Sequence, residues 1–218
     1  MEKKSSVEAS LRRQQATLSE ERVLAAQGYS FIAGVDEVGR GPLAGPAVAA
    51  AVILPRNIEA GWLSLVRDSK QLTAAARETL FPLIQEASVA VGIGYAEPGD
   101  IDSLGIARAV RMAMSSAVAN LSQQPDFLLI DFLALGELAI PQRSVAKADC
   151  FSASVACASI IAKVTRDRLM TALDELYPHY GFARHKGYGT PEHLDCLRRL
   201  GACPAHRRSF APVREFLR

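Results

Sequence analysis

Two adjacent carboxylates, Asp36 and Glu37, carry the clearest chemical signal in the sequence. An apolar run of strand character, residues 31–35, precedes them, and Gly39-Arg40-Gly41 follows at once. The backbone is therefore bare and tightly bent where charge is concentrated, which suggests a site for a metal ion and a phosphate. Adjacent residues of a strand point to opposite faces, so both acids can serve one site only if the strand ends or bulges there. An ordinary strand exit with solvated acids stays open, because short motifs often match by chance.

Two further acids stand where they could join this pair. Asp131 ends the apolar run 127–131, and Asp149 follows a possible strand over 143–146. The four carboxylates could therefore converge at one edge of a sheet. A carboxylate cluster without a set of histidine and cysteine ligands favours a hard cation such as Mg²⁺ or Mn²⁺.

The C-terminal end of the chain is basic. Residues 184–218 hold eight Lys and Arg against three acids, although the formal net charge of the whole chain is only +2. A basic end facing an acidic centre suits a phosphate-binding enzyme that uses metal ions. A solvated basic surface is the simpler alternative.

The elements that must position these residues follow from the hydrophobic pattern. Apolar runs predict four strands, over 31–35, 47–54, 88–96 and 127–131, and residues 143–146 are a possible fifth. Helical spacing predicts a helix ended by Gly28 and further helices over 74–87 with an N-cap at Thr73, 102–121 with an N-cap at Asp102, 152–176 and 192–200. The first two strands are near in sequence and would pair antiparallel. This order predicts an α/β fold, with a mixed five-stranded sheet flanked by helices and a small C-terminal helical extension.

Length and composition limit the classes of protein to which this chain can belong. A chain of 218 residues with 49% hydrophobic and 22% charged residues predicts one globular domain, here 18–218 with its helical part from about 178, after a flexible tail over 1–17. The longest apolar run, 47–54, is far too short to span a membrane, and the N-terminus lacks the apolar core of a secretory signal. No C-x-x-C pair occurs among Cys150, Cys157, Cys196 and Cys203, so we expect reduced thiols in a cytoplasmic protein.

Six segments together resemble the ribonuclease HII family, in its order and approximate spacing. They are AGVDEVGRGPLAGP over 33–46, DSKQL over 68–72, KAD over 147–149, ASIIAKVTRD over 158–167, YGF with HKGYGT within 180–190, and HRRSF over 206–210. The resemblance covers about residues 18–216. It implies an RNase H-like fold and endonucleolytic cleavage of RNA in RNA/DNA hybrids, including a lone ribonucleotide in duplex DNA, with 3′-hydroxyl and 5′-phosphate ends. It implies no membrane partner, and we expect a monomer.

The resemblance also assigns roles to residues. The metal ligands map to Asp36, Glu37, Asp131 and Asp149, which would hold two divalent cations, Mn²⁺ or Mg²⁺, and leave positions for the scissile phosphate and the attacking water. Gly39, Arg40 and Gly41 would read the ribose 2′-hydroxyl. Tyr188 would stack on the sugar after the ribonucleotide. The candidate phosphate contacts are Lys70, Lys163, Arg184, Lys186, Arg207 and Arg208, any of which could instead be a surface salt-bridge partner.

Some features depart from this pattern or leave alternatives. Phe132 stands where the family usually has glycine, so the exit of the strand that ends at Asp131 could differ. Asp167 lies well inside a predicted helix, which favours a salt bridge with Arg or a capping role over a fifth metal ligand. The alternatives to the nuclease are a non-catalytic hybrid-binding module and an RNase H-like DNase. Acids that repel phosphate unless metals neutralise them argue against the first, and Gly39-Arg40-Gly41 with Tyr188 argues against the second.

Overall fold

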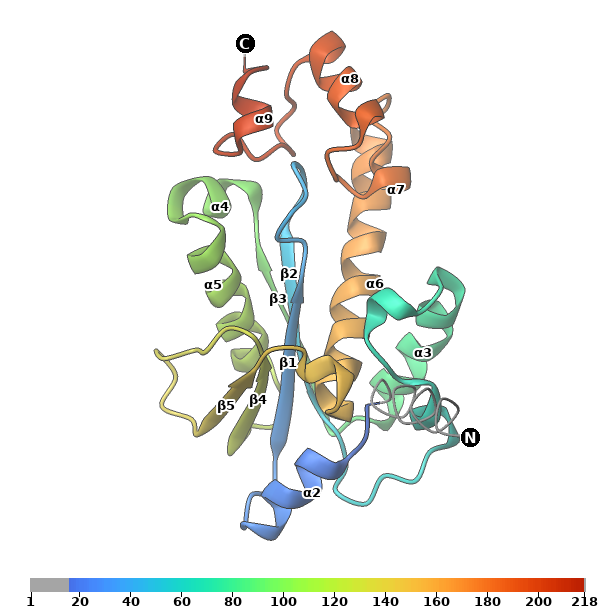
Figure 1. Ribbon diagram of the computed structural model, residues 1–218, viewed down its shortest axis with the longest axis vertical. Coiled ribbons are helices and arrows are strands. Elements are labelled where there is room, and N and C mark those ends of the chain that lie inside the picture. Colours follow the sequence, from blue (N-terminus) through green and yellow to red (C-terminus); the bar gives the residue numbers. More distant parts are fainter. Residues whose placement is uncertain (1–15, 218) are drawn as a thin grey trace, which may run out of the picture.

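The structure, a computed structural model, describes residues 16–217, and its centre is a mixed five-stranded sheet (Figure 1). The strands lie in the order β3-β2-β1-β4-β5, with bounds β1 Ile32–Val38, β2 Ala47–Ile53, β3 Ala90–Ala96, β4 Phe127–Asp131 and β5 Gln142–Val145. The first three strands are antiparallel, whereas β4 and β5 run parallel to β1 and to each other. The predicted mixed sheet and the antiparallel pairing of the first two strands are confirmed.

Helices cover both faces of the sheet. In Figure 1, α5 (Ile106–Ala119) lies on one side of the strands, and α6 (Ala153–Leu176) lies on the other with α3 (Ala74–Ala87) beside it. Every residue of β2 is buried, and its small side chains alternate between a core under α5 and a core under α6. Helix α3 begins and ends as predicted, with Thr73 Oγ1 accepting the amide hydrogen of Ala76 at 3.2 Å.

The second half of α6 runs past the sheet and supports the C-terminal part of the chain (Figure 1). This part contains α7 (Phe182–His185), α8 (Pro191–Leu200) and α9 (Ala211–Arg214). Met170 of α6 packs there against Tyr180 and Phe182. The predicted C-terminal helical extension is therefore present, although α9 follows the helix that we expected to be the last. The remaining helical elements are α2 (Ser19–Ala26), α4 (Pro98–Leu104) and the 3₁₀ turns η1 (Gly61–Leu65), η2 (Ser69–Gln71) and η3 (Ala148–Cys150).

The predicted helix over 102–121 is wrong at its start. Two helices, α4 and α5, meet there at Gly105, whose φ of 77° breaks the helical path. Asp102 lies inside α4 and caps no helix; its carboxylate instead accepts hydrogen bonds from the backbone amides of Arg208 at 2.9 Å and Ser209 at 2.8 Å. A short polar side chain has the same local signature whether it caps a helix or binds a distant loop.

The N-terminal boundary also differs from the prediction. Ala16 is buried, and Thr17 donates its amide hydrogen to Phe151 and accepts one from Ala153. Ala16 and Thr17 are therefore held by the folded domain, and the rest of the tail predicted over 1–17 lies outside the described residues. Over residues 16–217, no helix combines the length and the apolar character that a membrane crossing requires.

Candidate active site

The acidic pair lies inside β1. Asp36 and Glu37 pair with Ala50 and Ala49 of β2 in unbroken register, so the strand does not bulge at the acids, and it ends one residue after Glu37, at Val38. The pairing of β1 with β4 stops at Val35. Beyond that point no described strand pairs with this side of β1, and both carboxylates can border the same gap.

Asp131 and Asp149 face this gap from neighbouring segments. Asp131 is the last residue of β4, and its Oδ1 accepts the amide hydrogen of Ala148 at 2.8 Å, which fixes the start of η3. Lys147 turns the chain into η3 with a left-handed φ of 64°, and Asp149 follows within η3, where it is buried. A backbone hydrogen bond thus joins the two segments that carry these acids.

The pKa shifts show that the four carboxylates lie together. Burial is the largest cause that raises the pKa of Asp36, and the charges of Glu37, Asp131 and Asp149 raise it further. Burial likewise raises the pKa of Glu37, where the guanidinium of Arg40 opposes the shift and Asp131 adds to it. Acids brought this close repel one another when ionised, so the arrangement needs a positive charge between them.

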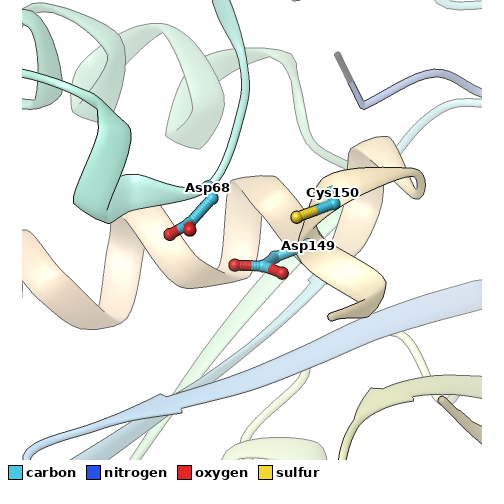
Figure 2. Close-up of side chains that lie close together, drawn as sticks. All are labelled: Asp68, Asp149 and Cys150. Atoms are coloured by element: carbon cyan, nitrogen blue, oxygen red, sulfur yellow. The ribbon is translucent and has the colours of Figure 1, made fainter. Parts of the chain in front are cut away.

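A fifth carboxylate, Asp68, lies beside Asp149, and sequence reasoning missed it. Figure 2 shows the Asp68 and Asp149 carboxylates turned toward each other, with the thiol of Cys150 next to them. Their ligand atoms all lie within 4.8 Å of one another. Burial and the charge of Asp68 raise the pKa of Asp149 to about 6, and burial and Asp149 raise the pKa of Cys150 to about 11, so this thiol stays protonated at neutral pH. The signal for Asp68 was its place in the Asp-Ser-Lys segment, from which we took only Lys70.

These residues fit a hard divalent cation. Glu37 Oε2 is buried and has no hydrogen-bond partner among residues 16–217, so it is an acceptor atom that could bind a cation. Asp36, Asp131, Asp149 and Asp68 add further carboxylates, which are the donors that Mg²⁺ and Mn²⁺ prefer, and the nearby Cys150 thiol stays protonated. Burial alone would lower the pKa of Lys70, but the charges of Asp68 and Asp36, with Asp149 and Asp131, raise it. Lys70 is therefore a cation at the edge of the acidic cluster.

A cavity of about 470 Å³ opens next to the acids. Its walls bring together residues from five separate segments: Glu37, Val38, Gly39, Arg40, Gly41, Lys70, Asp131, Phe132, Ala146, Lys147 and Tyr188. Tyr188 is 45% exposed, so its ring is accessible beside the cavity. Two of the predicted metal ligands, the whole Gly-Arg-Gly turn (residues 39–41), Lys70 and Tyr188 thus share one hollow. Among the described residues, Lys147 is a further cation there that the sequence analysis did not single out.

The two glycines of the Gly-Arg-Gly turn lack side chains for different reasons. Gly39 has a φ of 94°, and a Cβ there would lie 2.4 Å from Nε of Arg166. Gly39 is therefore required by the backbone conformation and by the packing of Arg166 against it. At Gly41 φ is not positive, and a Cβ would meet one atom within 4 Å, Cε1 of Tyr188 at 3.8 Å. The space in front of Gly41 is open toward the cavity, where a substrate can approach the backbone.

Four of the predicted phosphate contacts lie outside this cavity, and each has a protein partner. Lys163 forms a salt bridge with Asp167 at 2.6 Å. Arg77 also pairs with Asp167, at 3.7 Å, which confirms the predicted salt bridge of Asp167 with an arginine. Lys186 donates to the carbonyl of Asp167 and to Thr171 Oγ1, both at 3.2 Å. The exposed side chain of Arg184 pairs with Glu192, and the backbone of Arg208, an exposed residue, is held by Asp102.

Arg207 is a correction to the sequence analysis. Its side chain is fully buried, and its guanidinium donates to the backbone carbonyls of Gly39, Arg40 and Gly45. A group with no exposed surface and three intramolecular acceptors cannot contact a phosphate directly. The basic C-terminal composition did not distinguish such a buried arginine from a surface one.

Phe132 follows Asp131 with a left-handed φ of 63°, a conformation that favours glycine. Its ring is 57% exposed, and the guanidinium carbon of Arg40 lies 5.3 Å from the ring centroid. The exit of β4 therefore keeps a turn suited to the expected glycine, and Asp131 is still directed toward Asp36 and Glu37.

The chain matches known proteins over most of its length. The family model described as Ribonuclease HII matches residues 33–213. Ribonuclease HII of Geobacillus thermodenitrificans (strain NG80-2) is 56% identical over 197 residues, which cover 90% of this chain and 74% of that protein. Ribonuclease HII of Desulfitobacterium hafniense (strain Y51) is 54% identical over 203 residues, covering 93% of this chain and 77% of that protein.

A solved structure shares the fold. The crystal structure of ribonuclease H2 from Pyrococcus horikoshii OT3 superposes with a TM-score of 0.71 at 27% identity, covering 85% of this chain and 96% of that one. The shared fold, the matched sequence segments and the cluster of acidic residues all support the same family assignment. The chain belongs to the ribonuclease HII family, and it is a hydrolase of the ribonuclease H type.

Proposed function

We propose that the protein hydrolyses the RNA strand of RNA/DNA hybrids and cuts duplex DNA on the 5′ side of a single embedded ribonucleotide, leaving 3′-hydroxyl and 5′-phosphate ends. The observation that carries the proposal is the open backbone at Gly41, which faces Tyr188 beside the acids. RNA and DNA differ at the 2′-hydroxyl, so a bare peptide group at this point can distinguish them by hydrogen bonding and fit. Family membership supports the coarser activity, endonucleolytic cleavage of RNA/DNA hybrids.

Asp36, Glu37, Asp131 and Asp149 would hold two divalent cations, Mn²⁺ or Mg²⁺. The support is the mutual repulsion of these carboxylates and the unpaired Oε2 of Glu37. When bound, such cations lower the pKa of a water molecule and stabilise the charge that develops on a leaving oxygen. The nucleophile is then water, and no covalent enzyme intermediate is required.

The protein's own residues orient the nucleic acid around that centre. Arg40, Lys70 and Lys147 place positive charge along the cavity, where they can contact phosphates. Tyr188 presents an exposed ring against which the sugar following the ribonucleotide can stack. Lys163, Lys186, Arg184 and Arg208 are left as contacts for a longer duplex. The side chains of Lys163, Lys186 and Arg184 would have to exchange their present partners, whereas Arg208 is held through its backbone.

The proposal extends to the oligomeric state, the location and the partner of the protein. We propose a monomer that works in the cytoplasm, where its four cysteines, all free in the structure, would stay reduced. Its partner is nucleic acid. Five carboxylates beside the cavity would lower the affinity of a non-catalytic hybrid-binding protein for nucleic acid, because carboxylates repel phosphate.

The test is cleavage of a duplex that carries one ribonucleotide, with Mg²⁺ or Mn²⁺ and with an all-DNA duplex of the same sequence as control. We expect one cut on the 5′ side of the ribonucleotide and none in the control. Absence of that cut, or equal cutting of the all-DNA duplex, would contradict the proposal. A long RNA/DNA hybrid, run in parallel, separates loss of ribonucleotide recognition from loss of all activity.

A further inference from the structure

Two arginines, Arg166 of α6 and Arg207, are fully buried behind the Gly-Arg-Gly turn. Neither forms a salt bridge with any residue in 16–217. Buried cations without a carboxylate partner are costly, because the charge loses its hydration. Hydrogen-bond acceptors must therefore stabilise the two guanidinium groups. The positions of these acceptors show which segments the arginines hold in place.

Arg207 holds the turn from one side. Its Nη2 donates to the carbonyl of Gly39 at 2.6 Å, its Nη1 to Arg40 at 3.1 Å, and its Nε to Gly45 at 3.0 Å. The planar guanidinium thus bridges both ends of the loop 39–46. A lysine ammonium on a flexible stem cannot reproduce three such bonds in one plane.

Arg166 holds the same loop from the other side and links it to the segment that carries Tyr188. Its Nε donates to Pro46 at 2.9 Å and its Nη2 to Ala44 at 3.1 Å, while its Nη1 donates to Lys186 at 3.0 Å. All six acceptors of the two arginines are backbone carbonyls. The two arginines therefore fix the backbone conformation of the segments that they contact.

Backbone hydrogen bonds complete the connection. The amide of Leu43 donates to Gly187 at 2.7 Å, and the amide of Gly45 donates to Ala205 at 2.8 Å. The Gly-Arg-Gly turn and Tyr188 are thus tied to one rigid unit, although about 150 residues separate them in the sequence.

We propose that Arg207 and Arg166 are positioning residues for ribose recognition, which set the Gly-Arg-Gly turn and Tyr188 at a fixed separation across the substrate. This inference rests on the proposed function, because the separation between the turn and Tyr188 matters only if the ribose binds between them. Neither arginine touches the nucleic acid, because neither has exposed surface. Burial and the nearby charge of Arg166 lower the pKa of Arg207 to about 9, which leaves it charged at neutral pH.

The test compares Arg207→Lys and Arg207→Gln with Arg214→Lys, a matched control. Arg214 also donates to a backbone carbonyl, that of Ser209 at 2.9 Å, but it is exposed. The first measurement is amide hydrogen exchange at Leu43 and Gly45. We expect at least tenfold faster exchange in the Arg207 variants, with the amides of β2 unchanged, and no change in the control.

The second measurement is the preference in binding for a duplex with one ribonucleotide over the same duplex in DNA. It is made in an Asp36→Asn background with Mg²⁺, so that neither duplex is cut. We expect the ratio of the two Kd values to fall at least fivefold in the Arg207 variants and to stay unchanged in the control. A variant that is merely less stable changes the concentration of folded protein and leaves this ratio alone.

Each outcome decides a different question. Unchanged exchange at Leu43 and Gly45 would overturn the positioning role, whatever the activity. Faster exchange with an unchanged Kd ratio would overturn its link to ribose recognition. If the Asp36→Asn parent binds both duplexes equally, the link to ribose recognition is overturned, whereas the cleavage test judges the proposed function and the exchange data judge the positioning role. If the Arg207 variants do not fold, Arg166→Lys releases the same loop from the opposite side and takes their place.

Discussion

The Cα of Gly41 faces the ring of Tyr188: a methyl group built on Gly41 would lie 3.8 Å from Cε1 of Tyr188. Within the described part of the chain, no other atom outside the neighbouring residues comes within 4 Å of that methyl group. The pair therefore encloses a space that the protein itself does not fill. In our proposal the ribose occupies this space.

Gly41→Ala is expected to leave the fold intact and to impair cleavage. The new methyl group has room in the free protein but would displace the sugar, and a displacement of about 1 Å can cost about 100-fold in rate. Thermal unfolding and cleavage of a duplex with one ribonucleotide check both parts. Gly39→Ala is the contrast, because its positive φ and its contact with Arg166 should cost about 2 kcal/mol or more of stability. Normal cleavage by Gly41→Ala would argue against ribose recognition at this turn.

Tyr188→Ala is expected to reduce cleavage at a single ribonucleotide by about tenfold or more, since stacking on an aromatic ring contributes about 1–3 kcal/mol. Long hybrids offer many binding registers, so their cleavage should fall less. Tyr188→Phe keeps the ring and serves as the control. An equal loss on both substrates would count against a role at the junction.

Asp36→Asn is expected to lower cleavage by at least about 100-fold while duplex binding survives, because it removes a candidate metal ligand. The same change removes one of several buried, mutually repelling acids. The metal-free variant should therefore unfold at the same temperature as the wild type or higher. A near-normal rate would show that the metal site is misassigned.

The metal-free protein should lose a stabilising contribution from Asp149 as the pH rises. Its pKa is about 6 in the folded state, against about 4 for an unperturbed Asp, so this contribution is full below about pH 4 and lost above about pH 6. The pKa values of His193 and His206, lowered to about 4 mainly by burial, act in the opposite sense over this range.

The difference between Asp149→Asn and the wild type isolates the carboxylate. In urea unfolding with a chelator, the variant should gain stability relative to the wild type as the pH rises from about 4 to about 7. Added Mg²⁺ should stabilise the wild type more at the higher pH, where the acids are ionised, and the variant much less. A difference that does not vary with pH would contradict this account.

Phe132→Gly should be more stable than Phe132→Ala by about 1 kcal/mol. Both variants lose the ring under Arg40, but only glycine relieves the left-handed backbone. Urea unfolding of the two variants measures the difference. Equal stabilities would show that this turn stores no strain.

Local patterning was enough to predict most of the fold. Apolar runs bounded by turn residues located four of the strands, and the possible fifth strand over 143–146 lies within one residue of β5. Thr73 marked the start of α3 because a side-chain cap acts within one turn of helix. The prediction failed at Asp102, whose partner is a loop more than 100 residues away. No local pattern contains that information.

For the site, the sequence by itself determined the inventory: four carboxylates, a bare turn and a tyrosine, each within a recognisable segment. Tertiary structure alone decided which groups meet. It brought Asp68 against Asp149, left Lys163 paired with Asp167, and buried Arg207, which we expected to contact phosphate, behind the Gly-Arg-Gly turn. The physical reason is that the burial and the partners of a charged side chain depend on segments distant in the chain. The acidic pair in β1 is therefore half of a site that only the packing of β4, η2 and η3 completes.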